Sequence, residues 1–310
     1  MQQRNDPALR EPSVFRMDVP RLSTGIPELD ALLGGGLLPG TLTAVVGSTG
    51  IGKTQLGLQF AQAGRGQEGR GGILFDMSAR GDSQNHADYA RRMFGWELRP
   101  VEPGRYIDLD RFFDGDYPHG DYIHIFEHSG RRVTRRDLEF DAWHDWQAEL
   151  ARRLSDSIAF FYGSFVRGVR RAVVDGIEPV DRPSDSIQME LFEYVYHQIL
   201  RKDPEWVARD LFRQHYRQHA EEVARHVYNP GRIGCLLLIT SHETTLEGLI
   251  ERPLAEGDLL SNANTVLYMG KIREGTRFRR AIYVAKHRGS VCPDEIIPYR
   301  IEDGGIRLEG

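Results

Sequence analysis

Short apolar runs bounded by turn residues alternate along this chain with longer stretches of helical periodicity. Apolar residues are concentrated at positions 42–46, 73–77, 172–174 and 235–239, and runs of this length are typical of buried strands. Between these runs, apolar residues recur every three or four positions, as expected for helices that pack one face on a sheet. The pattern predicts one large α/β domain in which strands and helices alternate.

Other segments give less regular patterns. Residues 86–98 read as a helix, and Arg105–Leu109 reads as a further strand. Alternating residues around Tyr122–Phe126, followed by a Ser-Gly turn, predict a β-hairpin or an extended excursion grafted on the core. Residues 137–169 have helical periodicity, with Trp143, Trp146, Leu150 and Leu154 on one stripe that we interpret as core.

The most informative stretch is LTAVVGSTGIGKTQLGLQF, which begins at Leu42. It combines an apolar strand, a glycine-rich loop with the spacing G-x-x-x-x-G-K-T, and an amphipathic helix, and so predicts a phosphate-binding P-loop. Glycines let successive amide groups point into one concavity, and the helix start adds positive charge. The predicted nucleotide-binding residues are Gly47, Ser48, Thr49, Gly50, Ile51, Gly52, Lys53, Thr54 and Gln55.

Two of these side chains have specific expected roles. Lys53 supplies a mobile positive charge for the β- and γ-phosphates of ATP, and the Thr54 hydroxyl is a ligand for Mg²⁺. A second nucleotide signal is the short strand before Asp175, which matches the Walker B pattern. A carboxylate at that strand end anchors the magnesium shell opposite Thr54, so Thr54 and Asp175 form the predicted metal site.

The segment from Ser23 to Gly64, with its Leu-Asp helix, glycine stop, Pro-Gly turn and P-loop, resembles the KaiC-like branch of the RecA-type P-loop ATPase superfamily. The similarity resumes at FGWEL, RAVVDG, CLLLITSH and AIYVAKHRG. The resemblance implies a RecA-like core, with a mostly parallel central sheet flanked by helices and nucleotide at the carboxyl ends of the strands. Residues 106–159 and 177–232 match poorly and are interpreted as insertions, one hairpin-like and one helical.

The resemblance also exposes a departure. Members of the family carry a glutamate that polarises the attacking water at the end of the second strand, and the corresponding position here is Ser78. A hydroxyl cannot act as this base, so two hypotheses stay open. Either hydrolysis is slow or absent, or a nearby carboxylate, Asp76 or Asp82, has taken over the role.

Near the end of the chain, AIYVAKHRG places Lys286 and Arg288 two residues apart on one strand face. One interpretation is purely structural: the exposed basic residues protect an edge strand against aggregation. In the family that the chain resembles, this Lys-x-Arg pair reaches the γ-phosphate bound to the neighbouring subunit. There it stabilises the charge that builds up on the phosphoryl group during transfer. That implies a homo-oligomer, a ring or a filament, with sites at subunit boundaries.

Four polar residues, His119, His124, Glu127 and His128, raise the question of a metal site in the predicted hairpin. Their spacing matches no recognised ligand pattern, so we interpret them as a solvated polar surface.

Composition narrows the remaining classes. The 310 residues carry a net charge of −5, which argues against a general nucleic-acid coat because phosphate-backbone binding leaves a basic footprint. No apolar run approaches membrane-spanning length, and the first residues lack the apolar core of a signal peptide. Two cysteines cannot build a disulfide framework, so we expect a cytoplasmic protein.

These observations predict residues 1–21 as a flexible arm and residues 22–310 as a single ATPase domain with two insertions. The first functional hypothesis is a Mg²⁺-dependent, ATP-binding KaiC/RecA-like ATPase or oligomeric switch. Alternatives are a recombinase-like DNA-binding ATPase and a non-hydrolysing nucleotide-binding adaptor. The helical insertion, which mixes Arg, His and aromatic residues, is a candidate surface for a protein partner.

Overall fold

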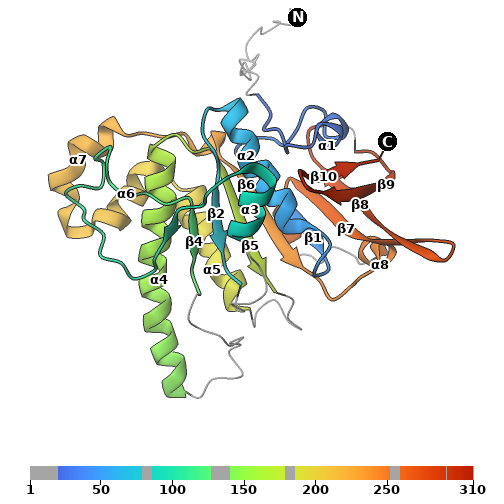
Figure 1. Cartoon of the computed structure of the whole chain (residues 1–310). Coiled ribbons are helices and arrows are strands. Elements are labelled where there is room, and N and C mark those ends of the chain that lie inside the picture. Colours follow the sequence, from blue (N-terminus) through green and yellow to red (C-terminus); the bar gives the residue numbers. More distant parts are fainter. Residues whose placement is uncertain are drawn as a thin grey trace, which may run out of the picture.

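A computed structural model describes residues 20–78, 86–126, 140–178, 186–251, 259–290 and 292–309; side chains of residues 140–151, 187 and 259–260 are not described. Its centre is a single ten-stranded sheet (Figure 1). The strand order is β10-β9-β8-β7-β1-β6-β5-β2-β4-β3. The strands are β1 (Leu42–Gly47), β2 (Ile73–Asp76), β3 (Pro100–Val101), β4 (Tyr122–His124), β5 (Arg171–Ile177), β6 (Gly234–Thr240), β7 (Thr265–Glu274), β8 (Arg277–His287), β9 (Ile296–Glu302) and β10 (Gly305–Leu308).

Strands β7 through β3 in that order are all parallel, whereas β7, β8, β9 and β10 form antiparallel pairs. The mostly parallel α/β core predicted from the sequence is therefore confirmed. Parallel strands must be covered on both faces, which explains why β1, β2 and β5 are buried along their whole length.

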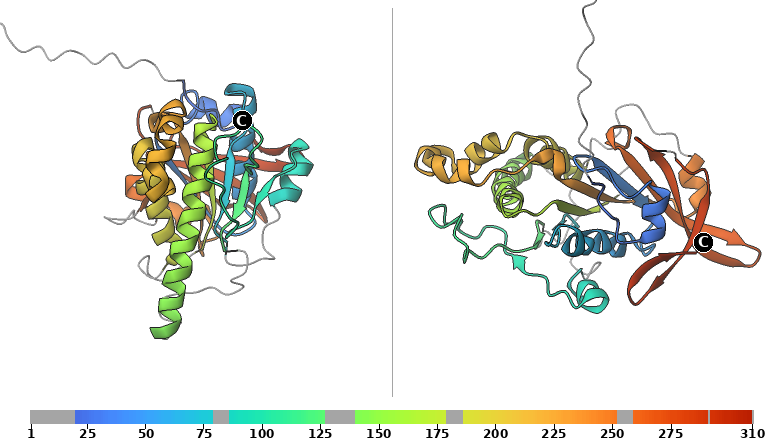
Figure 2. Two further views of the ribbon diagram at one scale, coloured as in Figure 1. Left: turned by 90° about the vertical axis from the view of Figure 1, so that its left-hand side faces the viewer. Right: turned by 90° about the horizontal axis from the view of Figure 1, so that it is seen from above.

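Helices cover the two faces of the sheet. Side chains of α1, α2 and α3 share one apolar core, and side chains of α4 through α8 share the other. The view from above shows these two layers on either side of the strands (Figure 2, right). The helices are α1 (Pro27–Leu32), α2 (Lys53–Gln67), α3 (His86–Phe94), α4 (Phe140–Val166), α5 (Ile187–Val195), α6 (Pro204–Phe212), α7 (Tyr216–Arg225), α8 (Leu246–Glu251) and α9 (Leu259–Asn262).

Two predictions for the first insertion are wrong. Tyr122–His124 is not part of a hairpin: it is strand β4, which pairs in parallel with both β2 and β3 inside the central sheet. The alternating pattern was correctly taken as a strand, but local sequence does not reveal whether the pairing partner is adjacent or distant. Arg105–Leu109 is not a strand either, and Ile107 and Leu109 pack on the core from a loop.

The second insertion is helical, as predicted, and its apolar side chains pack into the core. Helices α5 and α6, with a π-helical turn between them at Tyr196–Leu200, bury Phe192, Ile199, Val207 and Phe212 almost completely. These side chains join the same core as α4. The long helix α4 confirms the helical prediction for residues 137–169, although the stripe of Trp143, Trp146 and Leu150 lies outside the described side chains.

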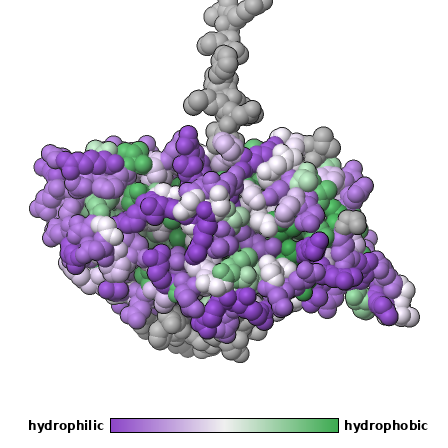
Figure 3. Space-filling model, turned by 45° about the horizontal axis from the view of Figure 1, so that its top comes forward, coloured by the Kyte–Doolittle hydropathy of each residue, from purple (hydrophilic) through white to green (hydrophobic). Residues whose placement is uncertain are grey.

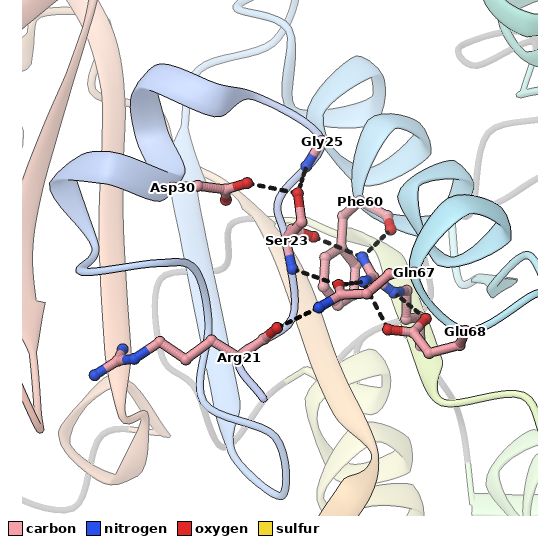
Figure 4. A network of polar contacts seen from close by, with 8 residues as sticks. Arg21, Ser23, Gly25, Asp30, Phe60, Gln67 and Glu68 are labelled. Carbon is pink, nitrogen blue, oxygen red and sulfur yellow. Dashed lines mark hydrogen bonds and ion pairs between the residues drawn. The ribbon is translucent and has the colours of Figure 1, made fainter. Parts of the chain in front are cut away.

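A buried arginine holds the start of β5 to the P-loop helix. Arg171 is fully buried and forms an ion pair with Glu68, with 2.7 Å between Nε and Oε2. Its guanidinium also donates to the carbonyl oxygens of Ser23 and Phe60. Figure 4 shows Ser23, Phe60, Gln67 and Glu68 converging on this point. The network joins the N-terminal segment, α2 and β5 into one unit.

No helix in the described part of the chain is long and apolar enough to cross a membrane. The face in Figure 3 is mostly hydrophilic, with apolar residues in separate spots.

Candidate nucleotide-binding site

The predicted P-loop lies at the carboxyl end of β1 and leads directly into α2. Gly50 and Gly52 have φ values of +74° and +115°, conformations that side chains disfavour, so the loop can double back only with glycine at these positions. Gly52 is the N-cap of α2, and no side chain caps the helix start. The first amide groups of α2 are therefore available to an anion at the positive end of the helix.

Lys53 lies within this concavity. Its Nζ donates to the carbonyl oxygens of Gly47 and Ser48, each at 2.9 Å. Burial lowers the pKa of Lys53 to about 8, although the nearby Asp175 carboxylate opposes the shift. A buried ammonium whose two hydrogen bonds here go to neutral carbonyls would gain from a phosphate anion beside it.

Asp175 and Thr54 meet across the edge of the sheet. The Thr54 hydroxyl donates to Asp175 Oδ2 at 2.8 Å. Burial by itself raises the pKa of Asp175, but hydrogen bonds from His86 and Thr54 and the charge of Lys53 hold it below its ordinary value. Two hard oxygen donors beside a phosphate cradle suit Mg²⁺, which is bound through few protein groups and phosphate oxygens.

His86, the first residue of α3, was missed by sequence reasoning. Its Nε2 lies 3.0 Å from Asp175 Oδ2, and its Nδ1 lies 3.4 Å from Asp76 Oδ2, so the ring bridges the carboxylates of adjacent strands. Asp76 and Asp175 are paired in register across β2 and β5. Two carboxylates in register at the ends of neighbouring parallel strands could have suggested a shared partner, but nothing in the sequence marks His86.

The region expected to hold the catalytic base has no exposed carboxylate among its described residues. Ser78 is buried, and its backbone amide donates to Asp76 Oδ1. Asp76 Oδ2 accepts a 2.9 Å hydrogen bond from the Tyr122 hydroxyl, so both Asp76 oxygens have partners within the protein. Asp82 lies outside the described residues.

The antiparallel part of the sheet supports the P-loop from outside. The Tyr299 hydroxyl donates to the carbonyl oxygen of Ile51 at 2.6 Å, and a Cβ on Gly52 would lie 2.9 Å from the Ile301 side chain. On the next turns of α2, Gln59 exchanges two hydrogen bonds with the backbone of Ile306. Such contacts depend on tertiary packing and have no local sequence signal.

Lys286 and Arg288 lie elsewhere. Strand β8 runs antiparallel to β7, so its end, and with it Lys286, lies at the amino edge of the parallel strands, away from the P-loop. Lys286 Nζ donates to the carbonyl oxygen of Ser261 at 2.6 Å. Within one chain the pair is therefore not brought to the P-loop, and its predicted role toward a neighbouring subunit stays a prediction.

The polar cluster in the first insertion does not form a metal site in the part that the structure describes. His119 Nε2 contacts the carbonyl oxygen of Phe112, and His124 Nε2 contacts that of Ser78. Glu127 and His128 lie outside the described residues. Among the described positions, no group of three or more metal-ligating side chains is present.

Comparison with known proteins agrees with this geometry. Residues 22–115 match the family model described as "ATPase: KaiC". The chain is 29% identical over 135 residues to the circadian clock protein KaiC3 of Synechocystis sp., and 35% identical over 92 residues to KaiC2 of the same organism. These matches cover 40% and 29% of this chain, and 26% and 15% of the relatives.

A shorter match, 50% identical over 46 residues, links the chain to the DNA repair protein RadA of Mycobacterium tuberculosis and covers 14% of this chain and 10% of RadA. All three relatives are thus matched over a minor part of their length. The matching segments agree with three features of the structure: the glycine-rich loop, the Thr54–Asp175 contact and the parallel sheet. Over the matched segment, the chain is similar to the KaiC-like branch of the RecA-type P-loop ATPases.

Proposed function

We propose that this chain binds Mg²⁺-ATP at the carboxyl edge of its sheet and works as an ATP-dependent oligomeric switch with slow hydrolysis. The observation that carries the proposal is the convergence of Lys53, Thr54 and Asp175 at the uncapped start of α2. These groups come from two distant segments, and a merely structural glycine turn would not require them to meet.

Each residue has a defined task. Amide groups of the loop and of the first turn of α2 hold the phosphate oxygens, and Lys53 exchanges its carbonyl contacts for them. Thr54 and Asp175 hold Mg²⁺, directly or through its water shell. When bound, Mg²⁺ neutralises charge on the phosphate oxygens.

Slow hydrolysis is supported by the surroundings of Ser78. It occupies the position where the resemblance expects a glutamate, and Asp76 beside it uses both oxygens in contacts with Ser78 and Tyr122. If Asp82, which lies outside the described residues, does not supply the base, a general-base contribution of roughly 10²–10⁴-fold is lost. ATP then serves mainly as a ligand that stabilises one state of the protein.

Calorimetric titration with ATP and Mg²⁺ tests binding. The unmodified chain is expected to release or take up heat with saturation, and Lys53→Ala to lose most of its affinity. Lys271→Ala changes an exposed lysine on β7 and serves as the matched control. Equal affinity in both variants would contradict the assignment of the P-loop.

Turnover and assembly are measured separately. Phosphate release from ATP should be slow, and Asp76→Asn and Asp82→Asn test whether either carboxylate contributes. Light scattering with and without ATP tests the homo-oligomer, and Lys286→Ala and Arg288→Ala test the subunit-boundary role. A chain that is monomeric in both conditions would exclude that role.

A further inference from the structure

A cluster of arginines lies at the edge of the sheet opposite the P-loop. Arg70, Arg99, His119 and Arg167 each come shortly before a parallel strand, respectively β2, β3, β4 and β5. Because these strands are parallel, the residues that precede them gather at the amino edge, whereas the P-loop and Asp175 follow strands at the carboxyl edge. In Figure 1 this edge is at the top of the molecule, where α2 and α4 end.

Two adjoining cavities open at this edge. The larger has a volume of about 550 Å³ and the smaller about 420 Å³. Both are lined by Arg70, Arg99, His119 and Arg167, so these residues lie between the two cavities. A volume of several hundred Å³ is that of a small-molecule site. We call the pair of cavities the amino-edge groove.

The arginines of the smaller cavity have few acidic partners. Within the described part of the chain, Arg65 and Arg70 form no ion pair, and Arg167 donates only to the carbonyl oxygens of Gly163, Phe112 and Asp114. Arg99 alone contacts a carboxylate, that of Asp121, at 3.4 Å. Asp121, which also accepts from the Trp96 indole and from the Arg99 amide, carries one negative charge and so balances only one of the four arginines.

The positive and negative charges that line the larger cavity are more nearly balanced. Its acidic residues are Glu102, Asp116 and Asp156, opposite Arg105 and the shared arginines. Asp116 is already paired with Arg111 at 2.8 Å, and Asp156 accepts from the Gly104 amide. The excess of positive charge is therefore concentrated in the smaller cavity.

The basic groups repel one another. Burial and the charge of Arg70 lower the pKa of Arg167, and burial and the charge of Arg167 lower the pKa of His119 to about 4. Like charges gathered around a concave surface are destabilising unless an anion relieves them. The carbonyl contacts of Arg167 meanwhile fix its guanidinium in place, which reduces the entropy lost on binding.

We propose that the amino-edge groove is a second ligand site, for a phosphate-bearing small molecule. Arg65, Arg70 and Arg167 contact phosphate oxygens in the smaller cavity, because guanidinium groups suit phosphate geometry. The rest of the ligand lies in the larger cavity, where Tyr106 is 85% exposed and Tyr117 also lines the wall. A nucleotide and an inorganic polyphosphate share this chemistry. The proposal does not depend on the function of the P-loop.

A purely structural role for these arginines predicts a different result. Arg65 lies in the last turn of α2 and Arg167 directly follows α4, where positive charge stabilises the carboxyl end of a helix. If that were their only role, removing a guanidinium would lower the melting temperature and leave anion binding unchanged.

The experiment uses the full chain carrying Lys53→Ala, so that the P-loop does not contribute. Sodium tripolyphosphate and ADP are titrated by calorimetry into this chain and into the same chain with Arg70→Ala added. Arg70 is exposed and its replacement should not prevent folding; Arg217→Ala on α7, also exposed, is the matched control. We expect Arg70→Ala to raise the Kd at least about tenfold and Arg217→Ala to leave it within about twofold.

Tighter binding of ADP than of tripolyphosphate identifies a nucleotide as the ligand class, and equal binding identifies the phosphate chain alone. No binding of either probe at millimolar concentration, or equal loss in both arginine variants, overturns the proposal. A lower melting temperature in Arg70→Ala with unchanged affinity also overturns it. If the P-loop does not bind nucleotide, the unmodified chain shows no binding beyond that of the chain with Lys53→Ala. The two failures are therefore distinguishable.

Discussion

The hydroxyl of Thr54 donates a 2.8 Å hydrogen bond to the carboxylate of Asp175, although 121 positions separate the two residues. The contact joins the start of α2 to the end of β5 across the intervening strand β6. It brings together the two residues that the sequence assigned to magnesium.

Asp175→Asn is expected to remove the magnesium dependence of ATP binding. An amide keeps the shape but loses the negative charge that anchors the ion, so the Kd for Mg²⁺-ATP should rise at least about tenfold. Titrations with Mg²⁺ and with EDTA measure this difference, and Asp303→Asn, at an exposed position, is the control. A magnesium effect that survives unchanged in Asp175→Asn would refute the assignment.

His86→Ala is expected to destabilise the fold. The substitution removes a buried contact to the charged Asp175 carboxylate and another to Asp76, so unfolding free energy should fall by about 1.5–3 kcal/mol. Urea denaturation followed by circular dichroism provides the measurement. His215→Ala, at an exposed position, should change stability by less than about 0.5 kcal/mol.

The buried pair of Arg171 and Glu68 should respond asymmetrically to mutation. Arg171→Met leaves the Glu68 carboxylate without its buried partner, so a loss of about 3–5 kcal/mol is expected. The double variant Arg171→Met/Glu68→Met should recover part of that loss. If the double variant is as unstable as the sum of the two single variants, the pair is not coupled.

Gly176, directly after Asp175, tests backbone geometry at the site. Its φ is +94°, and a Cβ there would lie 2.2 Å from the Ser78 amide nitrogen. Gly176→Ala should therefore lower stability by at least about 2 kcal/mol. Gly66→Ala, inside α2 with no atom within 4 Å of the new Cβ, should be neutral or stabilising by up to about 1 kcal/mol.

The lowered pKa of His119 predicts that the stability of the folded chain depends on pH. Its pKa is about 4 in the folded chain and 6.5 ordinarily, so between these values the unfolded chain binds more protons. The stability that neutral His119 provides is complete above pH 6.5 and is lost as the pH falls toward 4. His119→Gln should flatten this part of the curve of melting temperature against pH, and Arg167→Met should raise the His119 pKa measured by NMR.

Sequence reasoning identified those parts of the site that depend on local chemistry. The P-loop needs glycines and a Lys-Thr pair in one short segment, and the strand before Asp175 has a recognisable apolar pattern, so both were predicted at the correct edge of the sheet. The assignment of Ser78 to the position where the resemblance implies a glutamate rests on counting from Lys53 and stays a prediction.

The remaining features depend on which distant segments meet. Strand β4 was mistaken for half of a hairpin because Tyr122–His124 pairs in parallel with β2 and β3 and not antiparallel across a short turn. His86 and Tyr299 reach the site from α3 and β9, and neither belongs to a motif. The grouping of Arg70, Arg99 and Arg167 becomes apparent only when the strand order is known.

The support that Tyr299 gives to Ile51 has a consequence for dissecting this protein. Strand β1 is flanked by β6 and β7. The loop after β1 is supported from β9 by the hydrogen bond between Tyr299 and Ile51, which are 248 positions apart in the sequence. The segment that matches the KaiC model, residues 22–115, contains none of these neighbours. A fragment cut at that boundary would lack both strands that flank β1, so a fragment meant to keep the loop braced has to extend through β9.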